Sequence, residues 1–65
     1  MNIRKYYGRK VLITTEEQKK FAGTVIDYIF PEDNVPEGES IVIRSIDGEL
    51  IEFRPEEIRE IEEVR

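Results

Sequence analysis

Residues 8–30 of this 65-residue chain, GRKVLITTEEQKKFAGTVIDYIF, contain two apolar runs separated by a short polar segment. The first run is VLITT at 11–15, and the second, at 21–30, includes Thr24, Val25 and Ile26. β-Branched residues favour extended strands, and a short polar connection between two such runs is typical of a β-hairpin. The connection EEQKK has no Gly, Asn or Asp, the residues that tolerate positive φ. The sequence therefore predicts a hairpin but does not indicate its turn type, and Gly23 predicts a bend or a close backbone approach.

A second hairpin is predicted around Asp47-Gly48. This dipeptide is the strongest short turn signal in the chain. It lies between the β-branched run at 41–46 and a second apolar run at 50–53. We expect Asp47 and Gly48 at the tip of this hairpin, with Gly48 at positive φ because glycine has no Cβ.

The stretch 8–30 resembles the first motif of the Sm-like family of small β-barrels, a pattern partly shared by Src-homology-three-like barrels. The resemblance implies a five-stranded barrel whose subunits join through the edges of their sheets. The family's turn glycine is replaced by Gln18, its RNA-contacting aspartate by Ile29, and the glycine of its Ile-Arg-Gly motif by Ser45. The resemblance therefore implies the fold without the RNA-contacting residues. The matching positions are Gly8, Val11, Ile13, Phe21, Gly23, Val25 and Tyr28.

The remaining segments follow from local signals and from this resemblance. Residues 2–8 predict one helical turn ending at Gly8, and PEDNVPEGES at 31–40 predicts a solvated loop. Pro55 followed by two glutamates is a helix start, and apolar residues spaced by three continue that pattern to residue 64. The alternative, a 3₁₀ turn at 55–58 before a closing strand, agrees with the resemblance and is the one we expect.

The expected fold is all-β, with five strands near 10–15, 21–30, 40–46, 49–54 and 59–64. One domain spans 1–65, because a chain of this length supports a single small core. The predicted core residues are Val11, Ile13, Phe21, Val25, Tyr28, Ile41, Ile43, Ile51, Phe53, Ile58 and Ile61.

The composition argues against catalysis. The chain has no cysteine and no histidine, which removes the thiolate nucleophile and the commonest general base. Its four glycines stand alone, so no phosphate-binding loop is formed. The acids of the 31–40 loop do not follow the spacing of a calcium-binding loop. We therefore expect no enzyme activity, no catalytic residues, no cofactor and no metal site.

The charge is unevenly distributed and leaves two classes of function. Residues 1–20 carry six basic and two acidic residues (+4), whereas 21–65 carry four basic and thirteen acidic residues (−9). The acidic balance favours a protein-interaction or self-assembly module, with a protein partner or a second copy as the ligand, over a nucleic-acid binder. If RNA or DNA binds, we expect weak contact through the basic N-terminal third. The candidate contacts are Arg4, Lys5, Tyr6, Arg9, Lys10, Lys19 and Lys20.

The sequence also bears on membrane association and on the location of the protein in the cell. No apolar run approaches the ~18 residues of a membrane span, and the basic N-terminus is not followed by the apolar segment of a signal peptide. We therefore expect no membrane partner and a cytoplasmic location.

Overall fold

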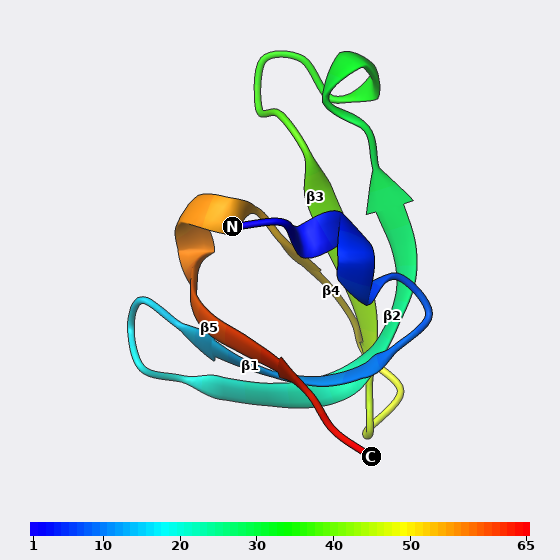
Figure 1. The fold of residues 1–65 in the computed structure, drawn as a ribbon, viewed down its shortest axis with the longest axis vertical. Helices are drawn as coiled ribbons and strands as arrows, with labels where there is room; N and C mark the ends of the chain where they lie inside the picture. Colours follow the sequence, from blue (N-terminus) through cyan, green and yellow to red (C-terminus); the bar gives the residue numbers. More distant parts are fainter.

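The computed structural model, which describes residues 1–65, contains one antiparallel sheet of five strands (Figure 1). The strands follow the spatial order β4-β3-β2-β1-β5, and the sheet curls so that its two edge strands, β4 and β5, are not paired with each other. The small all-β fold expected from the sequence is confirmed. The strand bounds are β1 Lys10–Thr15, β2 Lys20–Ile29, β3 Ser40–Ser45, β4 Leu50–Phe53 and β5 Ile58–Glu63.

Three short 3₁₀ turns complete the chain: η1 Ile3–Tyr6, η2 Pro31–Asp33 and η3 Pro55–Glu57. η1 is the expected N-terminal turn, and Gly8 follows it at φ +82°. The helical reading of the last segment is wrong, because η3 ends after one turn and β5 pairs antiparallel with β1. This pairing gives β1 hydrogen-bond partners on its second side, which a short exposed helix would not supply.

The tips of the two hairpins have the same geometry. In the β1–β2 tip, Thr15 N donates to Lys19 O at 2.8 Å and Gln18 N donates to Thr15 O at 2.8 Å. In the β3–β4 tip, Ser45 N donates to Glu49 O at 2.8 Å and Gly48 N donates to Ser45 O at 2.9 Å. Gly48 has φ +87°, as expected, and Gln18 occupies the equivalent left-handed position with φ +66°. The sequence of the β1–β2 connection did not indicate its turn type. The structure shows that this connection forms the same turn as the β3–β4 tip, with Gln18 in the position of Gly48.

The core lies inside the curl of the sheet and is almost entirely aliphatic. Ile3 of η1 is fully buried in it although the sequence did not indicate this, and η1 packs against β3. Phe21, Tyr28 and Ile51, which were predicted as core residues, are half-buried and pack against its margin. The core residues are Ile3, Val11, Ile13, Val25, Ile41, Ile43, Phe53, Ile58 and Ile61.

At Gly23 the backbone of β2 lies very close to that of β3. Gly23 pairs with Ser45 in register, and a Cβ at this position would collide with the backbone carbonyl of Arg44. The register between the two strands then shifts between Val25 and Asp27. The close backbone approach predicted at Gly23 is therefore confirmed, and only glycine fits there without displacement of the neighbouring strand.

None of the helical segments has the length and apolar character needed to cross a membrane.

Candidate functional site

The seven predicted nucleic-acid contacts lie in two groups. Arg4, Lys5 and Tyr6 belong to η1, Arg9 precedes β1 and Lys10 is its first residue. Lys19 and Lys20 lie at the other end of the same hairpin. In register, Lys10 pairs with Thr24 whereas Lys20 pairs with Thr14, so the two groups are separated by four strand positions, or roughly 13 Å. The first five residues are neighbours in the sequence but line three different grooves, with Arg4 in one, Lys5, Tyr6 and Arg9 in a second and Lys10 in a third. Lys19 and Lys20 lie apart from all of them.

Tyr6, the last residue of η1, and Tyr7, which follows it, have different environments. The Tyr6 ring packs against the core, its hydroxyl donates to Ile61 O at 3.4 Å, and Lys5 Nζ lies 5.2 Å from its ring centroid. Tyr7 is 59% exposed. Tyr6 therefore joins η1 to β5, and Tyr7 is the tyrosine whose ring is free to contact a ligand.

Arg4 lies over two aromatic rings at the end of β2. Its guanidinium carbon is 4.8 Å from the Phe30 ring centroid and 5.7 Å from that of Tyr28. The two rings meet edge to face at 4.9 Å, with 81° between their planes. This geometry is that of cation–π contact, and Arg4 forms no ion pair with a carboxylate.

A surface groove of about 410 Å³ opens beside this stack, which we call the aromatic groove. Arg4 is the only one of the seven predicted contacts among its lining residues, and the rings of Tyr28 and Phe30 were not predicted as site residues. Tyr28 and Phe30 are separated by two positions, a spacing that places side chains on the same face of a strand. That spacing is the signal that could have identified them. The lining residues are Arg4, Tyr7, Asp27, Tyr28 and Phe30.

Tyr28 also connects β2 to the loop that precedes β3. Its hydroxyl donates to Glu39 Oε1 at 2.5 Å. This hydrogen bond to a carboxylate is the main reason that the pKa of Tyr28 is raised above its ordinary value of 10.0, and partial desolvation and the charge of Glu39 act in the same direction. Tyr28 is therefore held neutral and oriented in the wall of the aromatic groove.

Acidic side chains offset part of the predicted basic surface. Arg9 Nη1 lies 3.8 Å from Glu63 Oε2, and Lys19 Nζ lies 4.0 Å from Glu17 Oε1. Both pairs are largely exposed, so each contributes little to stability. They nevertheless reduce the positive potential that a phosphate would meet.

Searches against protein-family models, curated proteins and solved structures find no match to this chain. The candidate site therefore rests on its own geometry. A guanidinium stacked on two rings beside an exposed tyrosine can hold a flat ring by stacking.

Proposed function

We propose that this protein is a non-catalytic, Sm-like β-barrel module that acts through protein interaction at the free edges of its sheet. The observation that supports this most directly is that β4 and β5 are edge strands, each paired on one side only. An unpaired edge presents backbone donors and acceptors that a strand from another chain can satisfy.

The hydrogen bonds of the β3–β4 hairpin identify the free groups of β4. Ser45 and Glu49 form a hydrogen-bonded pair, and in antiparallel strands such pairs alternate with pairs whose backbone groups point outward. In this register the outward groups belong to Leu50 and Glu52. The next outward donor, Arg54 N, is satisfied by Glu57 Oε1 at 2.8 Å. Leu50 and Glu52 are thus the positions where a further strand would pair.

The same reasoning applies to β5. Val64 N donates to Lys10 O at 2.8 Å, so the backbone groups of Ile61 and Glu63 point away from β1. Leu50 and Val64, at the ends of the two edge strands, are 63% and 46% exposed. Pairing of β4 in one copy with β5 in another is the self-assembly that the family resemblance implies, and it is one form of the proposed function.

Light scattering over a range of protein concentrations tests the self-assembly. We expect particles larger than the 7.7 kDa monomer. Leu50→Pro should abolish them because proline removes an outward N–H, whereas Leu50→Ala, which keeps that N–H, should retain the assembly. A monomer that binds nucleic acid tightly at high salt would overturn the proposed function.

Binding of single-stranded nucleic acid is a second candidate, favoured by the aromatic groove. A base can stack on the ring of Tyr7 or Phe30 while Arg4 neutralises a phosphate. We expect weak binding that is lost at physiological salt, because few phosphates can be neutralised by a divided basic surface. Titration of fluorescent oligo-U at low salt should show weaker binding for Phe30→Ala and Arg4→Gln than for the control Lys20→Gln, which removes a charge outside the groove. Equal affinities for all three variants would exclude this site.

A further inference from the structure

A second groove, of about 460 Å³, lies among the β1–β2 tip, β4 and η3, and we call it the acidic groove. Its apolar lining consists of Phe21, Ile51 and Phe53. The rings of Phe21 and Phe53 are 5.4 Å apart, and Phe21 and Ile51 are half-buried, so part of their surface remains available to a ligand. The groove therefore offers an apolar surface directly beside the free edge of β4.

The other walls of this groove are strongly acidic. Glutamates make up half of its ten lining residues, and Lys19 is the only basic one. Glu16 has no ion-pair partner, and the single partner of Glu17 is Lys19, at 4.0 Å. The five glutamates are Glu16, Glu17, Glu52, Glu56 and Glu57.

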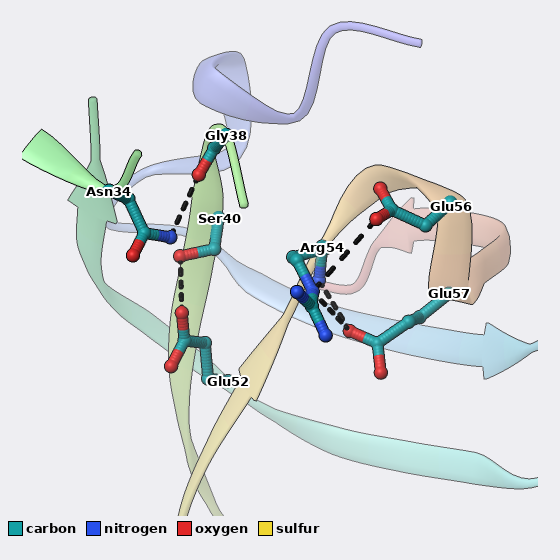
Figure 2. A network of polar contacts seen from close by, with 7 residues as sticks. All are labelled: Asn34, Gly38, Ser40, Glu52, Arg54, Glu56 and Glu57. Carbon is teal, nitrogen blue, oxygen red and sulfur yellow. Dashed lines mark hydrogen bonds and ion pairs between the residues drawn. The ribbon is translucent and has the colours of Figure 1, made fainter. Parts of the chain in front are cut away.

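Several of these carboxylates are held in place by neighbouring polar groups (Figure 2). Ser40 Oγ donates to Glu52 Oε2 at 2.7 Å. Arg54 Nε lies 3.9 Å from Glu56 Oε2 and 3.7 Å from Glu57 Oε1. Glu57 is committed to closing η3 because it also accepts from Arg54 N. Glu16, which has no ion pair, is therefore the carboxylate best able to meet a cation from outside. Glu17 and Glu56 follow, because their ion pairs, at 4.0 and 3.9 Å, are the longest in the chain and their carboxylates are largely exposed.

We infer that the acidic groove binds an extended, lysine- or arginine-rich segment of a partner protein, which adds to β4 as a further strand. The inference rests on the proposed function and specifies the partner. The backbone of the segment would pair with the outward groups of Leu50 and Glu52. Alternate side chains would then point to the same face as Ile51, where an apolar residue contacts the floor and a cation meets Glu16 or Glu56. Charge complementarity of this kind selects the partner and speeds its association.

A second copy of the chain can pair its β5 with β4, but it fits this groove less well than a basic segment does. Its β5 would bring Glu60 and Glu62, which share one strand face, against the acidic wall, with Arg59 as the only cation within the strand. Like charges placed across an interface weaken it. The electrostatics therefore favour a basic partner over self-pairing at β4.

The test uses fluorescence anisotropy with a fluorescein-labelled peptide of repeating Lys-Thr-Val-Thr, which places lysine and valine on the same strand face, and a matched peptide in which glutamate replaces lysine. We expect the basic peptide to bind at low salt and the acidic peptide not to bind. The double variant Glu16→Gln/Glu56→Gln should weaken binding by about three- to tenfold. The matched control Glu60→Gln/Glu62→Gln changes the net charge equally on β5 and should alter the affinity by less than about twofold.

Two further variants separate strand pairing from charge attraction. Leu50→Pro should reduce binding by at least about tenfold because it removes a backbone donor at the pairing edge, whereas Leu50→Ala should bind nearly as well as the wild type. Equal weakening by both glutamine pairs, or binding unaffected by Leu50→Pro, would overturn the inference. Light scattering on the same samples distinguishes the two failures: self-assembly without peptide binding overturns this inference and leaves the proposed function intact.

Discussion

The two hairpin tips form the same turn from different residues. In each tip a hydroxyl residue precedes the turn and accepts a hydrogen bond from the backbone N–H four residues later: Thr15 from Lys19 and Ser45 from Glu49, both at 3.1 Å. In each tip one residue has positive φ, and this is Gly48 in one and Gln18 in the other. A non-glycine residue in this conformation costs roughly 1–2 kcal/mol. The comparison shows that strand pairing can impose a turn that the local residues do not favour.

The largest expected difference between the hairpins lies in the aromatic residue that each contributes to the core. Phe53 is 4% exposed whereas Phe21 is half-buried. Phe53→Ala should therefore lower the free energy of unfolding by about 3–5 kcal/mol, and Phe21→Ala by less. Urea unfolding measures both values. If the alanine variants do not fold, Phe53→Leu and Phe21→Leu should keep the same order, and a larger loss at Phe21 would contradict the burial difference.

Gly48→Gln makes the second tip resemble the first. No neighbouring atom obstructs a side chain at this position, so the cost comes from the positive φ. We expect a loss of roughly 1 kcal/mol in the free energy of unfolding, because the strain of the left-handed backbone is partly offset by the lower entropy of the unfolded chain without this glycine. Glu49→Gln, at the next position, is the control and should change stability by less than about 0.5 kcal/mol. An unchanged midpoint for Gly48→Gln would show that this tip adopts another turn.

The reverse change, Gln18→Gly, should stabilise the protein. Relief of the left-handed strain is partly offset by the greater entropy of glycine in the unfolded chain. The expected gain is therefore below about 1 kcal/mol, visible as a higher melting temperature. Glu17→Gly, at a position without positive φ, should give no gain. Destabilisation by Gln18→Gly would mean that Gln18 makes a compensating contact.

The turn hydroxyls provide a smaller contrast. Ser45 Oγ accepts hydrogen bonds from Asp47 N at 3.2 Å and from Glu49 N, whereas Thr15 Oγ1 accepts only from Lys19 N. Ser45→Ala should cost about 0.5–1 kcal/mol, and Thr15→Ala less, because these bonds are exposed to water. Ser45→Thr retains the hydroxyl and serves as the control in thermal unfolding. A larger loss for Thr15→Ala than for Ser45→Ala would contradict this order.

The hydrogen bond between Tyr28 and Glu39 should weaken at high pH. The folded state holds the pKa of Tyr28 above 10.0 through its hydrogen bond to Glu39. Stability from this pair is thus complete below pH 10 and falls as the pH rises through the raised pKa. A spectrophotometric tyrosinate titration, compared with Tyr28→Phe, identifies this residue. Glu39→Gln should return its pKa toward 10.0, and an unchanged titration would exclude the contact.

Most of the fold could be predicted from the sequence because each strand carries its own signal. VLITT at 11–15 and Asp47-Gly48 specify strands and a turn through local preferences. The burial of Ile3 could not be predicted, because one 3₁₀ turn is too short to show a periodic apolar face. The turn at Gln18 could not be predicted either, since the pairing of β1 with β2 overrides the local preference.

The candidate site was predictable only in part. Local charge indicated Arg4, but its aromatic partners come from the far end of β2, and their meeting depends on how η1 packs on the sheet. Tyr28 was assigned to the core because alternation does not show where a bent strand leaves the interior. The free edge of β4 depends on the final strand order, which no local pattern contains.

The pairing of β1 with β5 has a consequence for folding kinetics. Val11 lies opposite Glu63, so the partners in this ladder are separated by most of the described chain. Hairpins form in about 1–10 μs. Pairing between segments that are distant in the sequence is slower to begin, because closing the long loop between them costs conformational entropy. We therefore expect the docking of β5 to come late, and folding to be slower than for a helical protein of the same size.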